Sequence, residues 1–397
     1  MFKNIKNYTL FRRFFLYAVE NLGDNIDACS EIPNLQHAEF SKDLRFELES
    51  GKRFGPIKIA FKTFGKLNKE KNNTILIFPT LTATPQVAGE KIKGKKFSGW
   101  WQDIVGKGKA IDTEKFFVIC TDHFGGCYGS TGPSDKNPDT GKPYGMKFPP
   151  FFLKDLVKCV WELLQQQEIE KLHSVIGGSL GGLLALEFVA LHKNTAKNAI
   201  VLGASHKISA QSIALNHIAR QAIMLDPAWK NGNYYGKEFP EKGLSIARQI
   251  GHISYLNPGI LEQKFGREEV GKFKHFVSLS MQYQVESYLN YQGKKFCKRF
   301  DPNTYIYLSK AIDSFDIEKE FGSVQNAFAG TKTAFTNIAV SSDVLFPSKD
   351  SEELNSLLNK AGTKSELHIV ESEKGHDAIF IENEKIGKII EKALSNQ

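Results

Sequence analysis

The feature that most constrains the fold is a serine enclosed by glycines, because residues 177–182 read Gly-Gly-Ser-Leu-Gly-Gly. A short strand-like run, Ser174–Ile176, comes directly before this segment, and an apolar helix-like segment follows it. A G-x-S-x-G motif between a strand and a helix predicts a sharp turn that presents a nucleophilic serine, since larger residues beside it would collide with neighbouring backbone. The alternative is a tight glycine turn or a phosphate loop, in which Ser179 only caps the helix.

The rest of the chain alternates between strand-like and helix-like segments. Apolar residues recur with a helical period at 152–164 and 180–188. Strands are also predicted at Leu44–Leu48 and Ile57–Phe64, on either side of a turn at Gly51–Gly55. This alternation predicts an α/β fold with a doubly wound, mostly parallel sheet. Short, nearly all-apolar runs, typical of buried parallel strands, lie at Ile75–Phe78, Phe116–Cys120, Ser174–Ile176, Ala199–Leu202, Asn337–Val340 and Leu367–Val370.

The stretch 205–324 differs from its surroundings, with polar helical pieces, many aromatic residues and no comparable strand. We therefore expect a helical lid at 205–324, inserted between core segments 41–204 and 325–397, and an N-terminal extension at 1–40. The apolar run Phe11–Val19 within this extension contains Arg12 and Arg13 and has no small-residue cleavage pattern nearby. It favours a surface helix or a tail over a signal peptide.

Composition narrows the classes of function. No stretch approaches the roughly eighteen uncharged apolar residues that a membrane-spanning helix needs. The net charge is +8, but the basic residues are scattered. The densest group, Lys91–Lys96, is typical of a solvated loop; the alternative is a patch that attracts a polyanionic cofactor. The 5 cysteines form no C-x-x-C pair, so neither a disulfide framework nor a zinc site is indicated. We expect a cytoplasmic protein without a metal, a membrane partner or a nucleic-acid partner.

A nucleophilic serine needs a base to take its proton and an acid to hold that base. The chain has 10 histidines. His376 stands out because it lies in the short loop after a predicted strand, Leu367–Val370. Asp343 follows the strand predicted at Asn337–Val340 in the same way; its alternative is a turn cap, and Asp313 and Asp316 are rival acids. The chain order Ser179, Asp343, His376 is that of the α/β hydrolases and predicts their fold.

The oxyanion formed during acyl transfer would need two backbone N–H donors. One is expected from Leu180, the residue after the nucleophile. The other should come from the loop after the strand Ile75–Phe78, where Leu81 is our candidate, since Pro79 has no N–H.

Several further motifs follow one another in a fixed order, at Gly99–Trp101, Gly125–Pro133, Asp226–Pro227, Gly243–Arg248, Arg299–Asp301, Asp343–Pro347 and Gly375–Ala378. Together with residues 177–182, this series resembles the homoserine O-acetyltransferase family of α/β-hydrolase-fold acyltransferases, from about Leu44 to Ile381. The resemblance implies transfer of an acyl group from acyl-CoA, as co-substrate, to the hydroxyl of L-homoserine, a step toward methionine. It also implies a ping-pong route through an acyl-serine, no bound cofactor, and a homodimer formed through the lid.

By motif position, the resemblance makes Ser179 the nucleophile, His376 the base and Asp343 the orienting acid. It makes Arg248, Tyr255 and Asp377 the residues that hold the amino-acid acceptor. The chemistry fits, because a guanidinium suits the acceptor's carboxylate and a carboxylate suits its ammonium group. The alternative for Arg248 is a salt bridge within the lid.

The sequence departs from the family pattern at three places. The loop after the first core strand usually reads His-Ala-Leu-Thr-Gly, whereas residues 79–83 read Pro-Thr-Leu-Thr-Ala. An Asn-Val-Leu segment is replaced by Asp122, His123 and Phe124, and the methionine after the nucleophile is Leu180. Acetyl and succinyl donors, and homoserine and serine acceptors, remain alternatives. A carboxylic-ester hydrolase would use the same triad with water as acceptor, and a non-catalytic relative would be expected to have lost a triad residue.

Overall fold

The computed structural model describes residues 32–41, 46–89, 99–270 and 281–395. The predicted segment Phe11–Val19, the basic run Lys91–Lys96 and the first two residues of the predicted strand Leu44–Leu48 lie outside these ranges.

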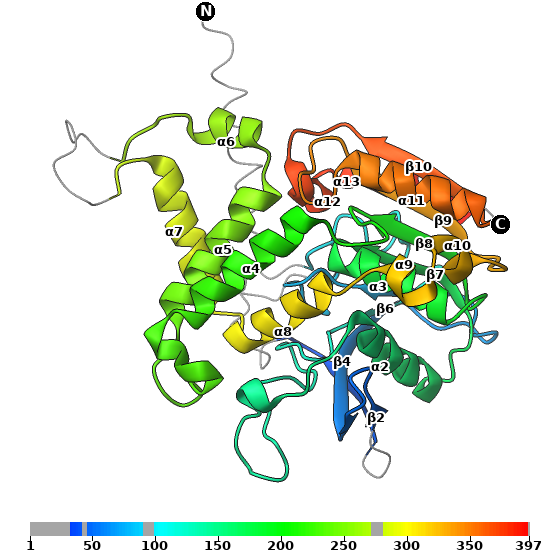
Figure 1. Cartoon of the computed structure of the whole chain (residues 1–397). Helices are drawn as coiled ribbons and strands as arrows, with labels where there is room; N and C mark the ends of the chain where they lie inside the picture. The colour runs from blue at the N-terminus through cyan, green and yellow to red at the C-terminus, as the bar shows by residue number, and fades with distance from the viewer. Residues whose placement is uncertain (1–31, 42–45, 90–98, 271–280, 396–397) are drawn as a thin grey trace, which may run out of the picture.

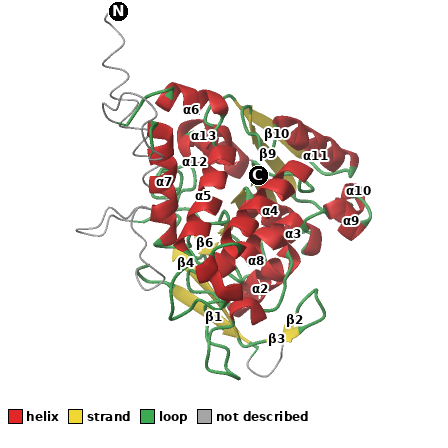
Figure 2. Cartoon of the chain, turned by 60° about the vertical axis from the view of Figure 1, so that its left-hand side comes forward, coloured by secondary structure: helices red, strands yellow, loops and turns green. Residues whose placement is uncertain are grey.

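A sheet of 8 strands forms the centre of the described part (Figures 1 and 2). The strands from β6 to β10 along the sheet pair in parallel, and β4 and β1 are added antiparallel at one edge. In spatial order they are β1 (Gln36–Phe40), β4 (Ile57–Phe64), β6 (Phe117–Thr121), β5 (Thr74–Phe78), β7 (Leu172–Gly178), β8 (Ala196–Leu202), β9 (Ala334–Val340) and β10 (Ser365–Val370).

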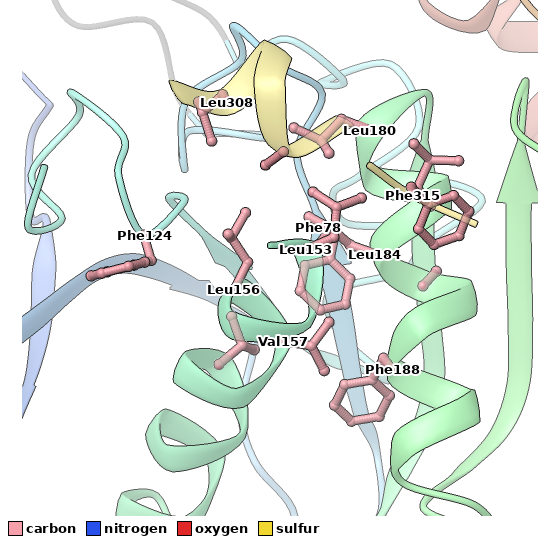
Figure 3. Packing of buried hydrophobic residues seen from close by; sticks show 14 of the residues in the cluster. Phe78, Phe124, Leu153, Leu156, Val157, Leu180, Leu184, Phe188, Leu308 and Phe315 are labelled. Atoms are coloured by element: carbon pink, nitrogen blue, oxygen red, sulfur yellow. The ribbon is translucent and has the colours of Figure 1, made fainter. Parts of the chain in front are cut away.

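Helices cover both faces of the sheet because the strands are apolar on both sides. Along β5, Leu76 and Phe78 face the helices α2 (Leu153–Gln166), α3 (Leu180–Leu191) and α11 (Ser348–Lys360). Ile75 and Ile77 face the opposite layer, which contains α13 (Asn383–Ser395). Figure 3 shows Phe78 packed between α2 and α3. Full burial of such a side chain contributes about 1.5–3 kcal/mol, so each strand is stabilised from both faces.

The strands predicted from the short apolar runs are all present, with ends that coincide or differ by at most three residues. The doubly wound, mostly parallel α/β sheet expected from the sequence is confirmed.

The sheet begins earlier than the core segment expected from residue 41, because β1 lies within the segment that was assigned to the N-terminal extension. Only Ala38 of this edge strand is buried, so the sequence has no apolar alternation there to reveal it. Around the turn at Gly51–Gly55, β2 (Phe46–Glu47) pairs with β3 (Arg53–Phe54) in a separate two-stranded sheet, while β4 joins the main sheet.

Between β8 and β9 the described chain is largely helical. The helices from α4 to α8, within residues 210–313, lie together beside the sheet in Figure 1, whereas α9 and α10 lie apart from them, near α3. Helix α5 packs against α4 and α7, and α4 also packs against α8. No described helix is long and apolar enough to cross a bilayer. The boundaries of the lid at 205 and 324 stay a prediction. The helices are α4 (Ala210–Met224), α5 (Glu241–Tyr255), α6 (Pro258–Phe265), α7 (Gln284–Cys297), α8 (Pro302–Asp313), α9 (Ile317–Phe321) and α10 (Val324–Phe328), with one short 3-10 turn, η3 (Pro227–Gly232); another, η2 (Gly145–Lys147), lies between β6 and α2.

Candidate active site

Ser179 occupies the turn between β7 and α3, at the carboxyl edge of the parallel strands. Its backbone has φ 55° and ψ −125°, a left-handed conformation that is strained for a residue with a side chain. Ser179 stands at the N-cap position of α3, yet its hydroxyl makes no capping hydrogen bond. The helix-cap alternative therefore has no support, and Ser179 as a whole residue is half-buried.

Two glycines allow this turn to close. A Cβ at Gly177 would lie 2.0 Å from the carbonyl oxygen of Gly181, and a Cβ at Gly181 would lie 2.2 Å from the carbonyl oxygen of Phe78. Real Cβ atoms do not approach backbone so closely, so neither position accepts a side chain without a backbone shift. The contact with Phe78 also brings the loop after β5 against the first turn of α3.

His376 and Asp343 are joined by a hydrogen bond of 2.6 Å between the Nδ1 of His376 and the Oδ2 of Asp343. His376 lies in η4 (Gly375–Asp377) after β10, and Asp343 lies in the loop after β9. The other oxygen of Asp343 accepts from the N–H groups of Leu345 (2.8 Å) and Phe346 (3.0 Å). Asp343 therefore caps a turn and holds the histidine at the same time.

The rival acids are occupied elsewhere. Asp313 forms a buried ion pair with Arg220, with 2.6 Å between Oδ2 and Nη2, in the contact between α4 and α8. Asp316 caps α9 by accepting the N–H of Lys319 at 3.0 Å. Of the three candidate carboxylates, only Asp343 reaches His376.

The hydrogen bond to Asp343 sets the protonation pattern of the histidine. Because a carboxylate only accepts, Nδ1 carries the hydrogen and the neutral ring keeps its lone pair on Nε2. This buried Nε2 has no hydrogen-bond partner among the described residues. Burial alone would lower the pKa of His376, but the charge and hydrogen bond of Asp343, together with Asp377, raise it overall. The result is a base with a strengthened affinity for a proton.

Ser179 and His376 both lie close to the end of β8, where Ser179 contacts Leu202 and His376 lies near Gly203. The N–H of Ser179 donates to the carbonyl oxygen of Leu202 at 2.9 Å. A Cβ on the next residue, Gly203, would lie 3.4 Å from both the Cε1 of His376 and the Oδ2 of Asp343. The three residues predicted for the triad are thus brought from distant parts of the chain to one edge of the sheet.

The two expected oxyanion donors lie on adjacent segments. Leu180 is the first residue of α3, so its N–H has no acceptor within the helix, and the positive end of the helix dipole adds to it. Leu81 lies in a turn after β5, in which the N–H of Ala83 donates to the carbonyl oxygen of Thr80 at 3.2 Å. Because β5 and β7 are neighbours in the sheet, this turn lies beside the Ser179 turn.

The residues predicted to hold the acceptor gather where α5 meets η4. A Cβ at Gly375 would lie 2.4 Å from the carbonyl oxygen of Tyr255, so the glycine permits the lid to rest directly on the histidine turn. The rings of Tyr255 and His376 have centroids 6.1 Å apart. The guanidinium carbon of Arg248 lies 5.7 Å from the ring centroid of Tyr255.

Asp377 and Arg248 are the two opposite charges of this cluster. Burial raises the pKa of Asp377 to about 6, although the positive charges of Arg248 and His376 lower it. Burial lowers the pKa of Arg248, and the charge of Arg299 lowers it further, against the opposing effect of Tyr255 and Asp377. No described carboxylate lies within 4.0 Å of the Arg248 guanidinium, so the predicted alternative, a lid salt bridge, is absent there; Arg220 forms such a bridge instead.

Two residues near the site were not assigned a role from the sequence. Arg299, in the motif Arg299–Asp301, donates from Nη1 to the carbonyl oxygen of Thr82 at 2.8 Å and to the hydroxyl of Tyr128 at 2.5 Å. The Nε2 of His123 lies 3.2 Å from the carbonyl oxygen of Thr80. The departure from the family pattern at 122–124 was the only signal for His123. In the described ranges, no group of three or more His, Cys, Asp or Glu side chains could hold a metal ion.

Comparison with known proteins places this geometry in context. A family model described as the alpha/beta hydrolase fold matches residues 73–383. A homoserine O-acetyltransferase of Methanococcus vannielii is 42% identical over 367 residues, which are 92% of this chain and 74% of that protein. The crystal structure of homoserine O-acetyltransferase from Bacillus anthracis superimposes with a TM-score of 0.85 at 29% identity, covering 91% of this chain and 98% of the other.

An esterase is also similar in structure. The crystal structure of esterase E22 has a TM-score of 0.84 and 25% identity to this chain, covering 91% of it and 100% of the esterase. The fold therefore accommodates either water or an alcohol as the acyl acceptor, and the choice depends on the pocket.

Proposed function

Because the chain belongs to the homoserine O-acetyltransferase family, and is an acyltransferase-type enzyme of the α/β hydrolase fold, we propose that it transfers an acetyl group from acetyl-CoA to the hydroxyl of L-homoserine. The product would serve methionine biosynthesis. The observation that carries the proposal is the charge arrangement at the site. The buried carboxylate of Asp377 is next to His376 in the chain, and the guanidinium of Arg248, which has no carboxylate partner among the described residues, lies over the Tyr255 ring that neighbours His376. They suit the two charges of an amino acid.

In the first half-reaction, Ser179 Oγ attacks the thioester carbonyl while the Nε2 of His376 takes the hydroxyl proton. The negative charge that develops on the carbonyl oxygen is accepted by the N–H groups of Leu81 and Leu180. The tetrahedral intermediate then collapses, the carbon–sulfur bond breaks, and His376 returns the proton to the leaving CoA sulfur. Asp343 keeps the ring oriented and stabilises its positive charge throughout.

In the second half-reaction, homoserine occupies the space vacated by CoA. Its carboxylate pairs with Arg248, beside the Tyr255 ring, and its ammonium group pairs with Asp377. His376 takes the proton of the homoserine hydroxyl, whose oxygen attacks the acyl-serine. Collapse breaks the bond to Ser179 Oγ, and the proton on His376 returns to that oxygen, so the enzyme is regenerated.

The proposal is tested by separating the two half-reactions. The protein is incubated with acetyl-CoA or succinyl-CoA, and its intact mass is measured; the preferred donor should add one acyl group to Ser179. Homoserine, serine or buffer alone is then added, and the loss of the acyl group is timed. Rapid discharge by homoserine with slow discharge by water is the expected result.

Arg248→Ala should impair only the second half-reaction. The change removes the partner of the acceptor's carboxylate, and a lost charge-assisted hydrogen bond of this kind costs about 1.5–3 kcal/mol, or roughly ten- to a hundred-fold in acceptor affinity. The burst of acylation should be nearly unchanged, because homoserine is absent from it. The measurement is the dependence of discharge rate on homoserine concentration.

A matched control for Arg248→Ala is Arg267→Ala. The exposed Arg267 also lies over a tyrosine ring, with its guanidinium carbon 5.3 Å from the centroid of Tyr283, but away from the site. Its removal should leave both half-reactions as they are. A slower burst with a normal discharge in Arg248→Ala would instead assign this arginine to the donor site.

The second candidate, an ester hydrolase, is favoured by the likeness to esterase E22. It shares the first half-reaction and differs only in the second. Discharge of the acyl-serine by water at the same rate with and without homoserine would establish it. Arg248 and Asp377 argue against it, since water needs neither charge.

A homodimer through the lid helices is the assembly we propose. Exposed apolar residues recur at seven-residue spacing on two packed helices: Ile218 and Leu225 along α4, and Ile246 and Ile253 on α5. Leu225 is 77% exposed. Residues seven apart share one helix face, so each pair forms a strip that a second copy could cover.

Leu225→Asp should halve the particle mass measured by light scattering at micromolar concentration, because it places a charge within the covered strip. The matched control is Ile369→Asp, on the edge strand β10 and also exposed, which should leave the mass unchanged. A monomeric unmodified protein would contradict the proposed assembly.

A further inference from the structure

The peptide that joins Thr80 to Leu81 has a hydrogen-bond partner at its carbonyl end that comes from another loop. The Nε2 of His123 lies 3.2 Å from the carbonyl oxygen of Thr80. His123 follows β6, and Thr80 follows β5, which is the parallel neighbour of β6. The contact therefore links two loops at the edge of the sheet where Ser179 lies.

The chemistry of this contact is set by the environment of the ring. His123 is only 3% exposed, and burial lowers its pKa to about 4, so it is neutral near pH 7. A carbonyl oxygen can only accept a hydrogen bond, so Nε2 must carry the hydrogen. The ring is a fixed neutral donor to Thr80.

The rigidity of the peptide carries this contact to the Leu81 N–H. In a trans peptide the C=O and the N–H lie in one plane and point in opposite directions. Among the described residues the only cis bond is Gly55–Pro56, so the Thr80–Leu81 peptide is trans. A donor that fixes the Thr80 carbonyl on one side therefore fixes the Leu81 N–H on the other, and polarises it through the shared amide.

The Thr82–Ala83 peptide, two peptides further along the loop, is held as well. The carbonyl oxygen of Thr82 accepts from Arg299 at 2.8 Å, and the hydroxyl of Tyr128 lies 3.4 Å from it. The carbonyl of Thr80 also closes the turn with Ala83. Leu81 thus lies between Thr80 and Thr82, whose carbonyl oxygens each accept a hydrogen bond from a side chain in another part of the chain.

We propose that His123 is a positioning residue, which orients the N–H of Leu81 toward the oxyanion by holding the opposite end of the same peptide. The proposal rests on the proposed acyl-serine route. In the family pattern, the corresponding Asn-Val-Leu segment has valine at this position, which offers no donor. The contact joins the two segments of this chain, the loop after β5 and residues 122–124, that depart from that pattern.

The test compares His123→Leu with His123→Gln. Leucine fills the space without a donor, whereas the side-chain amide of glutamine places an N–H near the position of Nε2. Single-turnover acylation of Ser179 is measured with p-nitrophenyl acetate and with acetyl-CoA, at saturating donor. His123→Leu should lower the acylation rate constant roughly ten- to a hundred-fold, somewhat less than the loss of an oxyanion donor itself.

Two features separate positioning from a general loss of structure. The donor concentration for half-maximal rate should change by less than about threefold, because the oxyanion forms only in the transition state. His123→Gln should recover most of the rate. The control is His192→Leu, which removes another histidine whose pKa burial strongly lowers. His192 follows α3 and its ring is stacked on Trp161 of α2, so this change should leave the rate unchanged.

The other possible results either contradict the role proposed for His123 or separate that role from the proposed function. Equal losses in the leucine and glutamine variants, a rate within about twofold of the unmodified protein in His123→Leu, or an effect confined to half-saturation would overturn the proposal. If p-nitrophenyl acetate acylates Ser179 and acetyl-CoA does not, the proposed function fails, while the rates with the ester still test the role of His123. If no donor acylates Ser179, both are wrong.

Discussion

Ser179→Ala should lose acyl transfer almost completely, by roughly a million-fold in kcat, while the protein keeps its fold. Alanine has no oxygen to form the acyl-enzyme, and the remaining oxyanion donors and His376 cannot replace the covalent step. The fold should persist because Ser179 is a half-buried residue whose hydroxyl makes no capping hydrogen bond. The measurements are turnover, intact mass after incubation with acetyl-CoA, and the circular dichroism spectrum.

The control is Ser314→Ala, which removes an exposed hydroxyl at the end of α8 and should retain full turnover. Substantial turnover by Ser179→Ala with a native spectrum, or an acyl group that still attaches at the unmodified rate, would mean that another side chain is the nucleophile.

Asp343→Asn should lower turnover by roughly ten-thousand-fold, with little effect on the fold. The asparagine can still cap the turn at Leu345 and Phe346 through its oxygen, as Asp343 Oδ1 does now. Its NH₂ group would then face His376 and favour the tautomer that carries its hydrogen on Nε2. That ring can no longer take the proton of Ser179. Turnover and the pH dependence of the acylation burst are measured.

The matched control is Asp316→Asn, the same change at a rival acid. Asp316 accepts the N–H of Lys319 as the cap of α9, and asparagine caps a helix about as well as aspartate, so activity and stability should both be retained. Comparable losses in the two variants would remove the case for Asp343 as the partner of His376.

Prediction of the fold from the sequence succeeded where local periodicity determines structure. The strands β5, β7 and β8 are buried on both faces, so each is a short apolar run, and the runs could be recognised without knowing which strands are neighbours. The edge strand β1 was missed for the converse reason. Its stability comes from hydrogen bonds to β4, and its side chains are mostly exposed.

In the candidate site, too, some features could be predicted from the sequence and others could be judged only from the structure. The glycines around Ser179 could be read as a strained turn because the steric requirement is local, and the structure shows it in the contact between Gly177 and Gly181. The order of Ser179, Asp343 and His376 was available from the chain alone. Arg248 was different, because its alternative as a lid salt bridge could be judged only from the structure, in which Arg220 forms such a bridge and Arg248 forms none among the described residues.

The sequence by itself determined the strand-and-helix alternation and the turn that carries Ser179, and it supplied the candidate nucleophile, the candidate base and three candidate acids. Each of these depends on side chains within a few residues of one another. Only the tertiary structure decided which carboxylate reaches His376, that Arg248 has no carboxylate partner among the described residues, and that His123 holds the Thr80–Leu81 peptide. These contacts join segments separated by many residues, and they arise from the order of strands in the sheet, which no local pattern encodes.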